Sequence, residues 1–150
     1  MAQKIARVVV VAPDKPQSGM GHAITLNHPI RIQSVSMLDG VEAFSTSGTP
    51  VDCVKLAIYE VLKDKPDLIL SGINHGENSS SNVLYSGTMS AAIEGAMEGV
   101  PSIGISLSNY DSDANFNQYE SWVSDIISKA LTDGLPEHTC LNVNIPNVPG

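Results

Sequence analysis

Two Ser-Gly-Thr tripeptides stand where the sequence predicts the start of a helix, one at residues 47–49 and one at Ser86, Gly87 and Thr88. Serine and threonine can cap a helix by accepting hydrogen bonds from its first N–H groups. We favour capping for the first tripeptide, because Pro50 follows it and removes a backbone donor. For the second we favour an anion site, since its glycine lets a ligand approach the backbone and the helix dipole points at it.

Three further neutral side chains follow predicted strands. Asn74 and Asn78 lie just past the end of one strand, and Ser18 lies in the long loop after the first strand. Asparagines at such positions can simply form turns. They can instead offer a carbonyl oxygen to a hard metal ion and an amide N–H to a phosphate. His75, between the asparagines, is a further candidate contact to an anionic ligand.

The charge distribution limits what these residues can bind. The 150 residues carry a net charge of −8 at pH 7. Residues 51–150 hold four basic and thirteen acidic side chains, so an anion there must rely on N–H groups, hydroxyls, amides or a metal. A protein that wraps a nucleic-acid polymer needs clustered Lys and Arg, and an anionic membrane surface needs the same. We therefore expect neither partner.

The elements that must position these side chains alternate between strand and helix. Continuous apolar runs predict buried strands at residues 8–12, 67–71 and 102–107. A further strand is predicted at 140–145, with shorter ones at 30–35 and 42–45. Apolar periodicity predicts helices at residues 50–63, 87–98 and 116–131. This order is typical of an α/β, Rossmann-like fold with a largely parallel sheet and helices on both faces. Such sheets bind ligands beyond the carboxyl ends of their strands, where the loops with Ser18, Asn74 and Asn78 begin.

Several familiar motifs are incomplete. Gly19 and Gly21 are only a fragment of a dinucleotide-binding fingerprint, and the sequence contains no Walker A motif. Ser106 lies inside an apolar strand, so we interpret it as structural and not as a nucleophile. Asp111 begins like a calcium loop, but Phe116 stands where the loop needs glycine.

The sequence also indicates a compartment. Cys53 and Cys140 are far apart and lie in apolar stretches, which favours free core thiols over a disulfide or a zinc site. No segment reaches the roughly 20 apolar residues of a membrane span, and the first residues lack a secretion signal. We expect a cytoplasmic protein.

Four segments, in chain order, resemble one known family. They are VVVAPDKPQSG (residues 9–19), SGTPVDCV (47–54), KPDLILSGINHGEN (65–78) and LYSGTMSAAIEG (84–95). The later segment LNVNIP (141–146) is also similar. The chain resembles the SurE family, the survival-protein-E nucleotidases, along essentially its whole length.

This resemblance implies a three-layer α/β fold and a metal-dependent 5'-nucleotidase that hydrolyses nucleoside monophosphates. It also implies a divalent cation, Mg or Mn, and a homo-oligomer, either dimer or tetramer. In the family two adjacent aspartates, a serine and an asparagine hold the cation, and the last two correspond to Ser18 and Asn74. The phosphate-binding residues correspond to Asn78, Ser86, Gly87 and Thr88.

One part of the family pattern is missing. The aspartate pair follows a strand that lies upstream of the first strand here, and this sequence contains no Asp-Asp dipeptide. We therefore expect one SurE-like domain at residues 1–150 that is incomplete at both ends relative to the family. Ser18 and Asn74 are neutral, whereas Mg and Mn normally take at least one carboxylate. A non-catalytic phosphate- or nucleotide-binding module thus remains an alternative, and a purely structural scaffold is a weaker one.

Overall fold

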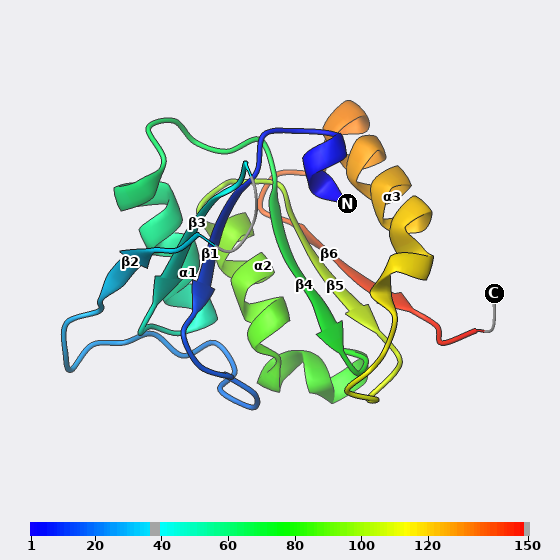
Figure 1. Ribbon diagram of the computed structural model, residues 1–150, viewed down its shortest axis with the longest axis horizontal. Helices are drawn as coiled ribbons and strands as arrows, with labels where there is room; N and C mark the ends of the chain where they lie inside the picture. Colours follow the sequence, from blue (N-terminus) through cyan, green and yellow to red (C-terminus); the bar gives the residue numbers. More distant parts are fainter. Residues whose placement is uncertain (37–39, 149–150) are drawn as a thin grey trace.

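The computed structural model describes residues 1–36 and 40–148, in which strands and helices alternate (Figure 1). The strands are β1 (Val9–Pro13), β2 (Ile32–Ser34), β3 (Glu42–Thr46), β4 (Ile69–His75), β5 (Ser102–Leu107) and β6 (Cys140–Ile145). The α-helices are α1 (Pro50–Leu56), α2 (Gly87–Met97) and α3 (Glu120–Asp133). Shorter helical segments are η1 (Ala2–Lys4), η2 (Ala57–Val61), η3 (Ser80–Tyr85) and η4 (Phe116–Tyr119).

The described strands form two three-stranded sheets. The first has the order β1-β3-β2, with β1 and β3 parallel and β2 antiparallel to β3. The second has the order β4-β5-β6 and is entirely parallel. The predicted largely parallel α/β arrangement is confirmed, but the strands belong to two ladders and not to one.

Helices cover both faces of the second sheet. Ile103 and Ile105 of β5 share an apolar core with Val123 of α3. Gly104, between them, faces α2, because a Cβ added there would meet the sulfur of Met89. Alternate residues of a strand point to opposite faces, so α2 and α3 lie on opposite sides of the sheet and make three layers. Helix α1 packs against both β1 and α2, and so connects the two sheets.

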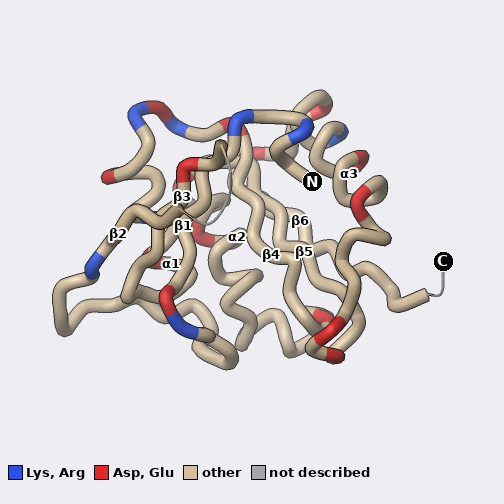
Figure 2. Tube along the Cα trace, viewed as in Figure 1, with Lys and Arg blue, Asp and Glu red and all other residues tan. Residues whose placement is uncertain are grey.

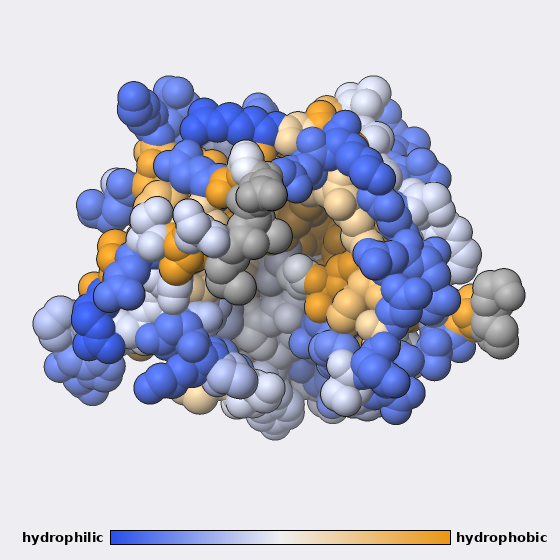
Figure 3. Space-filling view, in the orientation of Figure 1, coloured by the Kyte–Doolittle hydropathy of each residue, from blue (hydrophilic) through white to orange (hydrophobic). Residues whose placement is uncertain are grey.

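Two strands are less buried than their sequences predict. We expected residues 8–12 and 67–71 to be buried on both faces, but the residues of β1 and β4 are half-buried or exposed. By contrast, every residue of β5 is buried. The difference follows from position, because β1 and β4 each stand at the end of their ladder whereas β5 is central. Figure 3 shows the face of the molecule that is turned to the viewer in Figure 1. This face has a hollow in its middle, with hydrophobic residues along part of the wall.

Several boundaries also differ from expectation. The predicted helix at 116–131 begins with the 3-10 segment η4, and α3 then continues to Asp133. Strand β4 continues to His75 because Asn74 and His75 still pair with β5 after a register shift between Ser71 and Asn74. Asn74 therefore lies inside the end of a strand and not in the loop beyond it. The predicted helix at 50–63 is α-helical only to Leu56, and a π-helical turn then closes with Leu62 N–H donating to the Ala57 carbonyl.

None of the helices in the described ranges combines the length and the apolar composition needed to cross a bilayer.

Candidate functional site

The loops that carry the predicted site residues leave one edge of the fold. Strands β1, β4 and β5 point the same way in Figure 1, and residues 14–31, 76–86 and 108–115 follow their carboxyl ends. Figure 2 marks acidic residues in the loop that follows β5. An anion at this edge therefore depends on local donors and not on a general positive field.

Ser86, Gly87 and Thr88, which we call the α2 start, open an eleven-residue helix. The Ser86 hydroxyl oxygen accepts a 3.0 Å hydrogen bond from the Met89 N–H, so Ser86 caps the helix. That oxygen keeps its own hydrogen to donate. Within the described chain no acceptor is present for the N–H groups of Gly87 and Thr88. The α2 start therefore offers free donors at the positive end of the helix dipole.

Gly87 occupies a confined position. A Cβ added there would lie 3.0 Å from Cγ of Pro50 and 3.5 Å from the Gln17 carbonyl oxygen. The start of α1 and the loop after β1 therefore both reach the α2 start. Ser18, the neighbour of Gln17, is exposed in a turn of that loop.

Four contacts hold the part of the loop after β1 that follows Ser18. The Gly21 N–H donates to the Tyr85 carbonyl (3.2 Å), and the Ala23 carbonyl accepts from the Thr49 hydroxyl (2.7 Å). The His22 Nε2 atom lies 2.7 Å from a Glu94 carboxylate oxygen, and the Thr25 hydroxyl donates to Asp52 (2.6 Å). The segment that follows Ser18 is thus held against both α1 and α2. The atoms of these four contacts belong to Gly21, His22, Ala23, Thr25, Thr49, Asp52, Tyr85 and Glu94.

Glu94, which contacts His22 of this loop, also belongs to a cluster of charged side chains. Its side chain is 5% exposed and also lies 2.6 Å from Lys55 Nζ, which in turn contacts Glu98 at 2.7 Å. Burial raises the pKa of Glu94, but hydrogen bonds from Lys55 and His22 outweigh burial and hold it below its ordinary value. The same partnership with Glu94 and Glu98 raises the pKa of Lys55. Glu94 and Lys55 therefore stay charged near neutral pH. The contacts of Glu94 join α1, α2 and the loop.

Asn74 has a fixed orientation. Its Nδ2 group donates to the carbonyl oxygens of His75 and Gly76, both at 2.8 Å. The carbonyl oxygen Oδ1 is therefore the atom that Asn74 can offer to a ligand. The neighbouring His75 ring packs edge-on against Phe116, with ring centroids 4.7 Å apart.

Asn78 is 5% exposed and is held by strands of the second sheet. Its Nδ2 group donates to the Ser106 hydroxyl oxygen at 2.7 Å. Its backbone N–H donates to Oδ1 of Asn144 at 2.7 Å, and its carbonyl accepts from Nδ2 of Asn142 at 2.7 Å. Ser106 is fully buried, which agrees with its predicted structural role.

Asn142 and Asn144 are the residues at this edge that the sequence analysis missed. Their signal was the Asn-x-Asn spacing within a predicted strand, which puts two amides on the same face. Polar residues on one face of a strand usually indicate a solvated surface. Here that face receives the loop carrying Asn78.

The donors at this edge do not by themselves make a divalent-cation site. Asn74 and Ser18 supply neutral oxygens, which suit a hard cation as partial ligands. Across residues 1–36 and 40–148, no group of three or more His, Cys, Asp or Glu side chains is arranged to hold a metal ion. The carboxylate of Asp52 is already engaged, because it forms a capping box with Thr49 and accepts a hydrogen bond from the Thr25 hydroxyl.

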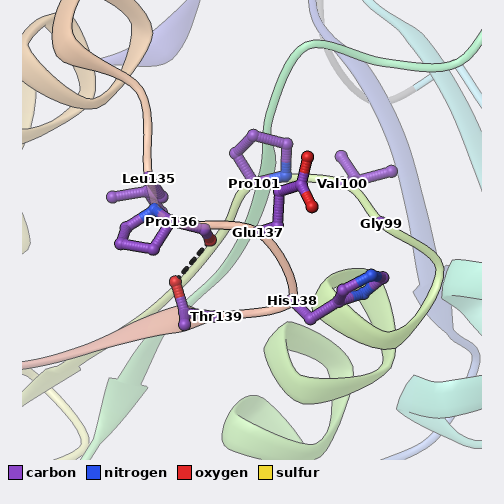
Figure 4. A pocket seen from close by; sticks show the side chains of 8 residues that line it. All are labelled: Gly99, Val100, Pro101, Leu135, Pro136, Glu137, His138 and Thr139. Carbon is purple, nitrogen blue, oxygen red and sulfur yellow. Dashed lines mark hydrogen bonds between the residues drawn. The ribbon is translucent and has the colours of Figure 1, made fainter.

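A cavity of about 280 Å³ lies at the opposite end of the second sheet, lined by residues 99–101 and 135–139 (Figure 4). Two of its polar side chains already have protein partners. The Thr139 hydroxyl donates to the Pro136 carbonyl at 2.6 Å, and His138 Nδ1 lies 3.2 Å from the Ala96 carbonyl. It adjoins the amino ends of β5 and β6, so it is separate from the site at the carboxyl ends.

Comparison with known proteins gives consistent matches. The family model "Survival protein SurE" matches residues 1–150. The 5'-nucleotidase SurE of Cytophaga hutchinsonii is 56% identical over 146 residues, covering 97% of this chain and 56% of that protein. The 5'-nucleotidase SurE of Flavobacterium psychrophilum is 55% identical over 145 residues, covering 96% of this chain and 56% of that protein.

A solved structure agrees with these matches. The crystal structure of the SurE protein from Aquifex aeolicus has a TM-score of 0.86 and 42% identity, covering 98% of this chain and 58% of that one. This chain thus spans a little over half the length of its relatives. With the family model matching from the first residue to the last, the chain belongs to the SurE family.

Proposed function

We propose that this chain contributes to a 5'-nucleotidase, in which a nucleoside monophosphate and water give a nucleoside and inorganic phosphate. The observation that carries the proposal is the α2 start, where free N–H groups of Gly87 and Thr88 stand beside the Ser86 hydroxyl. Relatives at more than half identity are named 5'-nucleotidase SurE, which supports the same reaction class.

The roles of the site residues follow from their free atoms. Ser86, Gly87 and Thr88 would bind the phosphoryl oxygens through N–H and hydroxyl donors, where negative charge is favoured. Asn78 would add its second amide hydrogen, since its first is bound to Ser106. These contacts would hold the phosphate in one orientation while water attacks its phosphorus atom and the nucleoside leaves.

We propose that Asn74, through Oδ1, and Ser18, through its hydroxyl, contribute to a site for Mg or Mn. Cations of this kind normally take at least one carboxylate, and the described donors are neutral. The absence of a carboxylate-based group in the described part of the chain favours the second candidate, a phosphate- or nucleotide-binding module without turnover.

Phosphate release from adenosine monophosphate, with and without Mn²⁺ or Mg²⁺, separates these candidates. In a protein of the relatives' full length that contains these residues, we expect metal-dependent release that Asn74→Ala abolishes, because the Nδ2 group of Asn74 is already engaged and Oδ1 is the atom it can offer to the cation. Asn82→Ala is the matched control, since Asn82 is exposed in η3, close to the site in sequence. Binding without release supports the binding module, and unchanged kinetics of Asn74→Ala remove Asn74 from the site.

We also propose a homo-oligomer, dimer or tetramer, with small nucleotides and no nucleic-acid polymer as partners. Large apolar side chains exposed near the site, such as Leu84 (71%) and Tyr110 (73%), support contact with further protein surface. The net charge of −8 opposes binding of a polymer of phosphates. The free thiols Cys53 and Cys140 support a reducing compartment, the cytoplasm.

A further inference from the structure

Asn78, Asn142 and Asn144 form a closed ring of three hydrogen bonds. The Asn78 N–H donates to Oδ1 of Asn144 (2.7 Å), and Nδ2 of Asn144 donates to Oδ1 of Asn142 (3.0 Å). Nδ2 of Asn142 then donates back to the Asn78 carbonyl (2.7 Å). Two side chains of β6 thereby satisfy both backbone polar groups of one loop residue.

The strand geometry explains why two asparagines can do this. Asn142 and Asn144 are two residues apart, so their side chains leave β6 on the same face. They pair in register with Gly104 and Ser106 of β5, on the face that α2 covers. Val143, between them, points the other way and packs against the apolar core.

The ring leaves part of the Asn78 side-chain amide free to bind a ligand. Its backbone is engaged by β6, and one hydrogen of Nδ2 is engaged by Ser106 of β5. The second Nδ2 hydrogen and Oδ1 have no partner in the described residues, and no unpartnered side-chain oxygen or nitrogen there is sealed from solvent. Asn78 is thus nearly buried, fixed on three sides, and open through one end of its amide.

We propose that Asn142 and Asn144 are positioning residues that fix Asn78 in the orientation needed to bind phosphate beside the α2 start. This inference rests on the proposed function, because it assigns a phosphate contact to Asn78. It follows that breaking any bond of the ring frees the loop between β4 and η3, so that Asn78 binds phosphate only after paying the cost of ordering.

The test is phosphate affinity in Asn142→Ala, Asn144→Ala and the double variant, measured by calorimetry with inorganic phosphate as the probe. We expect each single change to weaken binding about tenfold, the effect of losing one well-formed hydrogen bond. The double variant should be little weaker than either single one, because one break already opens the ring. Neutral alanine adds no charge near the anion.

Val143→Ala is the matched structural control. It removes apolar contact from the same strand, so it should lower the melting temperature while leaving phosphate affinity unchanged. Asn142→Ala, Asn144→Ala and the double variant should instead change affinity more than stability. If Val143→Ala weakens phosphate binding as much as they do, the asparagines act through strand stability alone and the proposal is overturned.

Amide hydrogen exchange at Asn78 makes the two hypotheses separable. The Asn78 N–H should exchange slowly in the unaltered chain and about tenfold faster in Asn144→Ala. Equal exchange rates overturn the positioning role, whether or not phosphate binds. Fast exchange in Asn144→Ala together with no phosphate binding by the unaltered chain overturns the proposed function and the role at phosphate. Should Asn144→Ala not fold, Asn142→Ala, whose side chain is exposed, gives the same readouts.

Discussion

The carboxylate of Asp52 joins three parts of the chain at one residue. It accepts the N–H and hydroxyl of Thr25 at 3.2 Å and 2.6 Å, and the N–H of Thr49 at 2.8 Å. Burial raises the pKa of Asp52, but these hydrogen bonds outweigh burial and hold it below its ordinary value of 3.8. A group whose pKa falls on folding stabilises the fold above its unfolded pKa.

We predict that Asp52→Asn lowers the free energy of unfolding by about 2 kcal/mol at pH 7, since it loses two or three charge-assisted hydrogen bonds. The difference from the unaltered chain should persist down to about pH 4 and shrink as the pH falls further, because the Asp52 carboxylate then takes up a proton. Urea unfolding between pH 7 and pH 3 measures it. Asp133→Asn, at an exposed acid paired with Lys129, should have a much smaller effect. A pH-independent difference for Asp52→Asn would contradict the assignment.

Sequence reasoning found half of this residue's role. The order Thr49-Pro50 predicts a capped helix start, and the structure shows there a capping box made by Thr49 and Asp52. The bonds from Thr25 could not be predicted, because Thr25 and Asp52 are 27 residues apart and meet only after the loop folds back. Asn142 and Asn144 were missed for the same reason, since their partner Asn78 is more than 60 residues away.

At the scale of elements, local patterns predicted whether a segment is a strand or a helix better than they predicted how deeply it is buried. The apolar runs correctly indicated strands at β1, β4 and β5, but only β5 is buried throughout. A continuous apolar run indicates a strand that is stabilised by burial. The helices and strands that cover it are set by the whole fold and not by the run itself. The extension of β4 to His75 likewise depends on pairing with β5 and has no local signal.

The loop after β1 is the element whose order matters most to the site, and His22 is its side-chain link to α2. We predict that His22→Ala speeds amide exchange of Gly21 and Thr25 by about five- to tenfold, because it removes the 2.7 Å contact with Glu94. Their N–H groups donate to the Tyr85 carbonyl and to Asp52, so their exchange reports loop opening directly.

Lys55→Met is the matched control for this loop. It removes the other partner of Glu94 and leaves the His22 contact in place. We expect it to lower overall stability while Gly21 and Thr25 keep their relative protection. If Lys55→Met exposes these two amides as much as His22→Ala does, the loop is held by the charge cluster as a whole and not by His22.

At the scale of the whole molecule, the two sheets meet through helices and not through a shared ladder. Strands β1 and β4 each end a ladder, and both keep residues that are half-buried or exposed. Unpaired strand edges and uncovered apolar surface favour association between chains. The net charge of −8 opposes association, so added salt should strengthen it.

We predict that this chain associates reversibly as its concentration rises and melts over a broad range when dilute. Leu70, 36% exposed on β4, should contribute to the contact, so Leu70→Lys should weaken association by placing a charge on the open strand. Leu131→Lys is the control, because Leu131 is 38% exposed on α3 and the two variants change the net charge equally. Sedimentation velocity over a range of concentrations, with circular dichroism to verify folding, measures the effect. The open edge of β4 is not a contact surface if the unaltered chain stays monomeric and melts in one sharp cooperative transition. The same conclusion follows if Leu70→Lys and Leu131→Lys change association equally.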